Sequence, residues 1–264
     1  MRDIETIING VDGILTYHKI RPSTIGNIQR QLEFIKGQKF LVTVDDGDIS
    51  FYNHLFPLLL RYNIPSILFV ITGLIDTNLP FWWDEVIYSL GATKGDKKLK
   101  SLKLMQNLDR IRFLREMRTG DYKRLQQTQL STEQLLEMQD QGIVIGNHSH
   151  SHPMFDMCTE DEIIAELKSS RSFFNKTGLN GYEYLAYPNG NFNGRVESVI
   201  KDQGIKYAFL FDHMLVRQPA NPLRLSRLSV NDDTPFWKFK MIVKGWHSRV
   251  LPLTTRLHRY IHGQ

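Results

Sequence analysis

The segment Phe40–Gly47 constrains the fold more than any other part of the chain. It opens with mostly apolar, partly β-branched residues that predict a buried strand, and this strand runs directly into Asp45 and Asp46. Ionised carboxylates resist burial unless they are paired or bound to a metal, so packing does not explain an acidic pair here. Two neighbouring Asp side chains diverge, which would let one hold a metal while the other transfers a proton. A simple turn is the alternative, because Asp and Gly are ordinary turn residues.

A second polar cluster follows another short apolar segment much further along the chain. Residues Ile143–Asn147 predict a strand that leads into three histidines, His148, His150 and His152. His148 and His152 are four residues apart and would share a face on one helical turn. Two imidazoles and one carboxylate with an open position form a common catalytic zinc set. The spacing therefore predicts a metal site, whereas His150, offset by two residues, is expected to point elsewhere.

Taken together, Thr43–Gly47 and His148–Pro153 resemble the paired motifs of the polysaccharide deacetylase family, the NodB-homology carbohydrate esterases. Those enzymes carry a T-[FV]-D-D-G motif followed by an H-[ST]-x-x-H motif, and the pair in this order is specific. The resemblance covers roughly residues 10–233 without the segment 91–130. It implies a distorted (β/α)7 barrel and the hydrolytic removal of N-acetyl groups from N-acetylhexosamine units of a polysaccharide or lipid-linked saccharide.

The remaining sequence alternates between predicted strands and predicted helices, which favours a closed or nearly closed parallel barrel. Barrels of this kind carry their chemistry at the carboxyl ends of the strands. Pro57 lies inside a helix predicted over 50–62 and would kink it or mark a later start. Ser131 and Thr159, each with a Gln or Glu three residues later, predict two capping boxes. The predicted strands cover residues 13–18, 40–44, 66–71, 143–147, 184–187, 207–211 and 223–230.

Charge separates the chain into a barrel and two basic appendages. We predict a barrel over residues 1–233, a helical insertion at about 91–130 and a C-terminal tail over 234–264. Residues 94–124 hold eleven Lys or Arg against four Asp or Glu, and the tail holds six Lys or Arg and no acid. Because the whole chain has a net charge of +5, its remainder is acidic. Basic patches attract anionic surfaces such as a membrane, and a solvated helix face is the alternative for the insertion.

Composition also limits the class of protein. No apolar run reaches the length of a membrane helix, and Met1–Gly13 lacks the apolar core of a signal peptide. Cys158 is the only cysteine, which excludes an internal disulfide and fits a reducing compartment. We therefore expect a cytoplasmic enzyme, with the inner face of a membrane as a candidate location. Nucleic acid is not an expected partner, since the basic segments lack interleaved aromatic residues.

The family resemblance assigns roles to individual residues around the metal. It implies that Asp46, His148 and His152 are the metal ligands and that Asp45 is the general base. Zinc is the metal that two His and one Asp suit best, and cobalt, nickel or manganese would accept similar ligands. A carboxylate beside the cation would stay ionised, as a base must.

Three more roles follow from the same resemblance. The segment that ends in His18 is similar to that of circularly permuted members, which de-N-acetylate poly-N-acetylglucosamine, and it implies His18 as the acid for the leaving amine. His213 is the alternative acid, and His18 would then be a strand-end histidine bonded to backbone. The backbone N–H of Tyr187, in a Tyr-Pro-Asn-Gly segment that resembles the third family motif, is expected to complete an oxyanion hole. The arginine that precedes this proline in many members is missing, and Arg227 is expected to replace it.

The residues alone leave two other functions open. One is a metal-dependent amidase that acts on non-sugar C–N bonds, and the other is a catalytically inactive glycan-binding protein. The intact set of carboxylates and imidazoles argues against the second. Trp82 and Trp83 are candidates for stacking on a sugar ring, with core contacts as the alternative.

Overall fold

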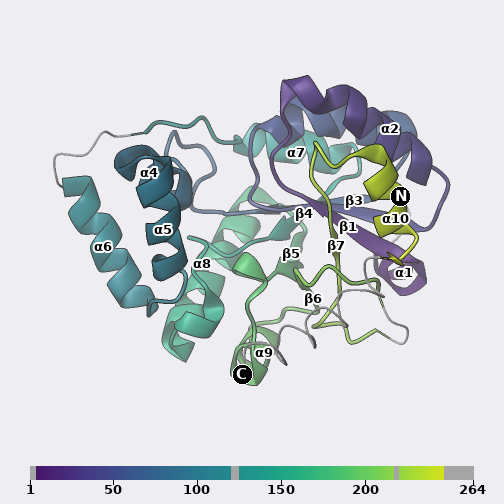
Figure 1. The fold of residues 1–264 in the computed structure, drawn as a ribbon. Helices are drawn as coiled ribbons and strands as arrows, with labels where there is room; N and C mark the ends of the chain where they lie inside the picture. The colour runs from purple at the N-terminus through teal and green to yellow at the C-terminus, as the bar shows by residue number, and fades with distance from the viewer. Residues whose placement is uncertain (1–3, 120–124, 217–219, 247–264) are drawn as a thin grey trace, which may run out of the picture.

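Seven parallel strands form one curled sheet in the computed structural model, which describes residues 4–119, 125–216 and 220–246 (Figure 1). The strand order is β6-β5-β4-β3-β2-β1-β7, and each neighbouring pair is parallel. The strands are β1 (Gly13–Tyr17), β2 (Phe40–Val44), β3 (Ser66–Val70), β4 (Val144–Asn147), β5 (Gly181–Ala186), β6 (Tyr207–Phe209) and β7 (Leu228–Ser229).

The apolar character of the strands explains their central position. Every residue of β1, β2 and β3 is buried, as expected for parallel strands that are covered on both faces. Tyr17 at the end of β1 pairs with Val44 at the end of β2, and the last residues of β3 and β4 pair with each other as well. The polar residues that follow these strands therefore lie together at one edge of the sheet.

The segment around β7 closes the barrel because it contacts both edge strands. Leu225 forms an isolated parallel bridge with Phe209 of β6, and Leu228–Ser229 pairs with β1. The strand predicted over 223–230 was therefore too long, since the backbone changes partner strand between Leu225 and Leu228. The predicted nearly closed (β/α)7 architecture is confirmed.

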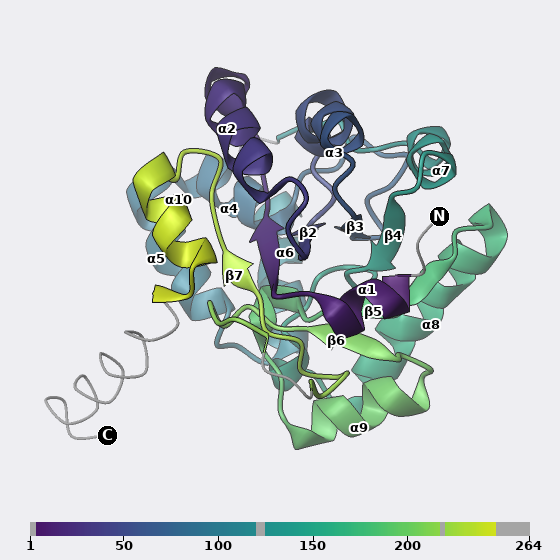
Figure 2. The same cartoon turned by 90° about the vertical axis from the view of Figure 1, so that its right-hand side faces the viewer.

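Helices surround the curled sheet, as Figures 1 and 2 show. The predicted capping boxes are present, with the Ser131 and Thr159 side chains accepting from the third helical N–H of α7 and α8. Pro57 marks a later start, because a π-helical turn at Phe51–Leu55 precedes α3. No helix of the described residues has the length and apolar character needed to cross a lipid bilayer. These surrounding helices are α1 (Ile4–Gly10), α2 (Ile25–Ile35), α3 (Phe56–Tyr62), α7 (Thr132–Asp140), α8 (Glu160–Thr177), α9 (Gly194–Asp202) and α10 (Phe236–Val243).

Three more helices extend from one side of the barrel, at the left of Figure 1, and we call them the arm. They are α4 (Trp82–Leu90), α5 (Ala92–Leu102) and α6 (Asn107–Thr119), the last two of which lie within the predicted insertion. Trp82, Leu102 and Leu114 of the arm share an apolar cluster with Met154, two residues after His152. The arm is therefore packed against the histidine segment and is not solvated on all sides.

The predicted basic tail is described only in its first part. α10 packs against α2, with the rings of Phe239 and Phe34 6.3 Å apart. Residues 247–264 of the tail lie outside the described residues.

Gly181 gives a test of the register between β4 and β5, where the ladder is irregular. A Cβ atom at this position would overlap the backbone carbonyl of Ile145, which no side-chain rotation can relieve. We predict that Gly181→Ala lowers the free energy of unfolding by about 1–3 kcal/mol, the usual range for overpacking. Urea unfolding measures this, with Gly194→Ala as the control, because nothing lies within 4 Å of a Cβ there. Equal stability of the two variants would contradict the prediction.

Candidate metal centre and active site

A cavity of about 320 Å³ lies at the carboxyl edge of the sheet. Residues that follow strands form most of its wall, and the arm supplies the rest. Its lining consists of His18, Asp45, Asp46, His148 and His152 after strands, Trp83, Leu99 and Lys103 from the arm, and Asn189, Gly190 and Phe211.

Asp46, His148 and His152 bring three potential ligand atoms together. Oδ1 of Asp46 lies 3.4 Å from Nε2 of His148 and 3.7 Å from Nε2 of His152. One ligand atom from each residue lies within 4.8 Å of the other two. Tetrahedral ligands about 2.1 Å from a zinc ion lie about 3.4 Å from one another. The spacing of the three side chains therefore fits a divalent metal of this kind.

Hydrogen bonding decides which nitrogen of His148 is available. Its Nδ1 lies 2.9 Å from the carbonyl oxygen of Ala186, and this nitrogen must donate because a carbonyl only accepts. Nε2 is then the atom left to face Asp46, the usual arrangement of a metal-binding histidine. Burial lowers the pKa of His148, but Asp46 and Asp45 raise it, and the net result is a raised pKa. A metal at this position would therefore compete with a proton for Nε2 of His148.

His152 stays neutral for a different reason. Its imidazole is buried, and burial lowers its pKa to about 3. Its Nδ1 atom is also buried and has no hydrogen-bond partner among the described residues. A neutral imidazole with an available nitrogen is suited to bind a metal, whereas an ion pair would require the protonated form.

The segment that carries the histidines is not a helical turn, which corrects the expectation from their spacing. Ser149 and His152 have φ angles of 65° and 56°, and Asp46 has a φ of 72°. Residues other than glycine keep this conformation only where their surroundings fix it. Here the N–H of Ser149 donates to Oδ1 of Asn147, and the N–H of His152 donates to Oγ of Ser149, each over 2.9 Å. A hydrogen-bonded loop therefore brings the two imidazoles together.

Neighbouring elements hold this loop from both sides. Glu166 of α8 accepts hydrogen bonds from the backbone N–H groups of His150 and Ser151. The indole N–H of Trp82 in the arm donates to the carbonyl oxygen of His152 over 3.3 Å. The imidazole of His150 contacts Thr72 and does not belong to the ligand group, as its offset predicted.

Asp45 lies beside the ligand group but is paired with Arg227. The guanidinium donates from Nη1 and Nη2 to the two carboxylate oxygens, each over 2.7 Å, and its side chain is completely buried. It also donates to the carbonyl of Leu210 and to the hydroxyl of Thr43. Burial raises the pKa of Asp45, but Arg227 and His148 lower it, and the net result is a lowered pKa. Asp45 is therefore an ionised, fixed carboxylate.

His18 and His213 differ in their relation to the cavity. His18 lines it, with Nε2 4.0 Å from Oδ2 of Asp45 and the imidazole edge-on to the ring of Phe211. His213 also contacts Phe211, with ring centroids 5.0 Å apart, but it is not part of the cavity lining. The geometry thus favours His18 over His213 as a group that reaches a ligand.

The expectation that the Tyr187 N–H completes an oxyanion hole is wrong in this structure. That N–H donates to the carbonyl oxygen of Phe209 over 3.1 Å, and the phenol donates to the carbonyl of Leu223. Asn189 and Gly190 line the cavity instead, and both have positive φ angles, 57° and 74°. The Asn-Gly pair is a turn signal that could have indicated a reversal of the chain toward the cavity.

The arm contributes to the cavity, and the sequence indicated this only for the two tryptophans at the start of α4. Trp82 is buried, so its interpretation as a core residue holds, whereas Trp83 lines the cavity with its ring 4.7 Å from that of His152. Leu99 and Lys103 of the basic segment were not singled out from the sequence. Helical spacing and charge gave no signal for them, because both are equally typical of a solvated helix.

Comparisons with known proteins agree with this geometry. A family model described as polysaccharide deacetylase matches residues 36–208. A curated relative from Staphylococcus aureus (strain MRSA252), poly-beta-1,6-N-acetyl-D-glucosamine N-deacetylase, is 24% identical over 215 residues. The match covers 78% of this chain, and the chain spans 57% of the length of that relative.

Solved structures support the fold. Streptococcus pyogenes deacetylase PplD, solved in complex with acetate, matches with a TM-score of 0.62 at 18% identity, over 88% of this chain and 97% of PplD. IcaB from Ammonifex degensii matches with a TM-score of 0.59 at 19% identity, again over 88% and 97% of the two chains. The segment matched by the family model is more than half of the chain and includes both Asp45-Asp46 and the histidine loop. This chain therefore belongs to the polysaccharide deacetylase family.

Proposed function

We propose that the protein is a metal-dependent hydrolase that removes N-acetyl groups from N-acetylhexosamine units of a polysaccharide or lipid-linked saccharide. The observation that carries this proposal is the convergence of Asp46, His148 and His152 beside an ionised Asp45 in one cavity. The name of the curated relative supports a poly-N-acetylglucosamine substrate. Family membership supports the reaction class.

Asp46, His148 and His152 would hold the metal, and zinc is the ion that this donor set suits best. When bound, such a metal lowers the pKa of a water molecule to about 7 and polarises an acyl carbonyl. The neighbouring carboxylates raise the pKa of His148, whereas burial lowers that of His152 to about 3, so the two imidazoles differ in how strongly a proton competes with the metal. Cobalt, nickel and manganese remain alternatives on ligand chemistry.

Asp45 would accept the proton from the attacking water. Its lowered pKa keeps it ionised at neutral pH, and each carboxylate oxygen keeps a second lone pair beside its bond to Arg227. Arg227 acts as a positioning residue, because its fork fixes both oxygens and allows little rotation of the carboxylate. His18, at the mouth of the same cavity, would donate a proton to the leaving amine.

Two variants separate metal binding from proton transfer. Asp45→Asn should keep the metal but lose turnover by about 10²- to 10⁴-fold, the usual effect of removing a general base. His148→Ala should lose the metal itself, because it removes one of three protein ligands. Metal content by mass spectrometry and acetate release from N-acetylglucosamine oligomers measure the two effects. Wild-type metal content and turnover in both variants would overturn the assignment, and faster release from simple acyl amides would favour a non-sugar amidase.

The buried ion pair between Arg227 and Asp45 gives a stability prediction. Arg227→Met should destabilise the metal-free protein by about 3–5 kcal/mol, because it leaves a buried carboxylate unpaired. Adding Asp45→Asn to this variant removes the charge and should restore part of the loss. Urea unfolding of both single variants and the double variant measures the coupling. If the double variant were no more stable than Arg227→Met, the ion pair would not be the source of the effect.

We also propose that α10 and the turn after it contact the anionic surface of a membrane. The inner face of the membrane is the location that the sequence analysis predicted. Trp237, Met241 and Trp246 are exposed there, and Trp237 is 64% exposed. Lys238, Lys240 and Lys244 are interspersed among them. Aromatic side chains favour the lipid–water interface, and each Lys near an anionic leaflet contributes about 1 kcal/mol.

Co-sedimentation with vesicles of phosphatidylcholine and increasing phosphatidylglycerol tests the membrane contact. Binding should increase with the anionic lipid, and Trp237→Ser should weaken it. Leu108→Ser is the matched control, because Leu108 of the arm is also 64% exposed. Binding that does not depend on the anionic fraction would overturn the proposal, and a stronger effect of Leu108→Ser would assign the contact to the arm.

A further inference from the structure

The last turn of α5 faces the cavity. Leu99 and Lys103 both line it, although the helix belongs to the arm. Leu102, which precedes Lys103 in the sequence, is fully buried in the apolar cluster of the arm. The N–H of Lys103 donates to the carbonyl of Leu99 over 3.0 Å, which closes this turn. Packing and this hydrogen bond therefore fix the position of the Lys103 backbone beside the cavity.

The ammonium group of Lys103 meets a neutral partner. Its Nζ donates to Oδ1 of Asn189, in the turn after β5, over 2.7 Å. Within the described residues no carboxylate oxygen lies at ion-pairing distance from it, whereas Lys19, outside the cavity lining, lies 3.8 Å from Asp48. Partial burial lowers the pKa of Lys103, and the nearby charge of Asp46 raises it by less, so that the net result is a lowered pKa.

The remaining charges of the cavity do not neutralise this ammonium. Asp45 is neutralised by Arg227, and Asp46 belongs to the group that would hold a dication. With the metal in place, the lining therefore carries an excess of positive charge, to which Lys103 contributes. A partly dehydrated cation beside a ligand cavity favours an anionic group of the ligand.

We propose that Lys103 is a specificity-determining residue that binds a phosphate or carboxylate group carried by the N-acylated saccharide. This inference rests on the proposed deacetylase function and adds the charge class of its substrate. An ammonium group has three N–H donors, so Lys103 can bind the anionic group while Asn189 keeps it in place. The arm would thus select the substrate, while residues of the barrel carry out the reaction.

Matched sugars test the proposal. The probes are methyl N-acetylglucosaminide, which is neutral, N-acetylglucosamine 1-phosphate, and N-acetylmuramic acid, which carries a carboxylate. Binding is measured by calorimetry on zinc-loaded protein in an Asp45→Asn background, where no turnover interferes, and kcat and KM are measured on otherwise wild-type protein. Lys103→Met should lower the affinity for the charged sugars about 10- to 100-fold more than the affinity for the neutral one. This ratio corresponds to the loss of one hydrogen bond to a charged group. Lys103→Arg should restore most of the difference.

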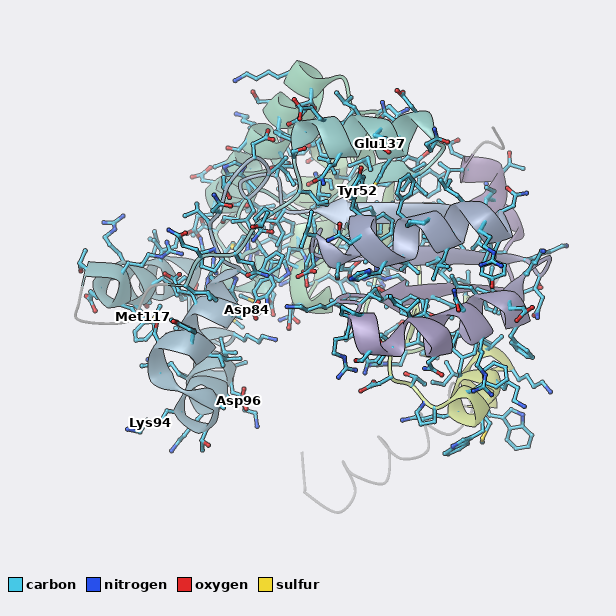
Figure 3. The ribbon with its side chains drawn as sticks, turned by 90° about the horizontal axis from the view of Figure 1, so that it is seen from above. Tyr52, Asp84, Lys94, Asp96, Met117 and Glu137 are labelled. Atoms are coloured by element: carbon cyan, nitrogen blue, oxygen red, sulfur yellow. The ribbon has the colours of Figure 1, made fainter. Side chains whose placement is uncertain are left out.

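Lys94→Met is the control, because Lys94 is exposed in the first turn of the same helix and lies at the outer end of the arm (Figure 3). It removes the same charge from the arm and should leave the three affinities unchanged. An equal effect of Lys94→Met would mean that the net charge of the arm, and not Lys103, is responsible, which would overturn the proposal.

Other outcomes are equally decisive. If Lys103→Met lowers kcat to the same extent for neutral and charged sugars, the residue acts on the reacting acyl group and the proposal is wrong. No change in any affinity would also overturn it. If the wild-type protein binds the charged sugars through Lys103 but releases no acetate from any sugar, the proposed deacetylase function fails while the assignment of Lys103 stands.

Discussion

The buried ion pair between Asp45 and Arg227 connects the closure of the barrel with the chemistry of the cavity. Burying two charges costs several kcal/mol per ion unless every donor and acceptor is satisfied. Here the guanidinium binds both carboxylate oxygens, the Leu210 carbonyl and the Thr43 hydroxyl. The backbone N–H of Arg227 donates to Oδ1 of Asp212. One interaction therefore holds β2 against the closing segment and keeps a buried carboxylate ionised.

The strand ends could be predicted from the sequence because each carries its own signal. A short apolar segment that runs into charged residues has few packing explanations, so Asp45 and the histidine loop were found from local patterns. The family resemblance supplied what local patterns could not, including Arg227, which lies 182 residues from its partner. Such a pair depends on the curl of the sheet and leaves no trace in the spacing of residues.

The misplaced expectations share a physical cause. The four-residue spacing of His148 and His152 fits a helical turn, but the side chains of Asn147 and Ser149 bind backbone N–H groups and favour a loop. The N–H of Tyr187 was expected to be available, but it is bonded to Phe209 as the β5 backbone continues past its last residue. In both cases a hydrogen bond with backbone decided the outcome, and such competition cannot be read from residue types alone.

The position of the closing segment has a consequence for synthesis on the ribosome. The chain emerges from its N-terminus, so β1 to β6 are complete before Arg227 becomes available. Until then β1 lacks a neighbour on one side, and the carboxylate of Asp45 lacks the cation that offsets its burial. The nascent protein therefore acquires the Asp45–Arg227 ion pair, and with it the wall of the cavity beside Asp46, only after almost the whole barrel has been synthesised.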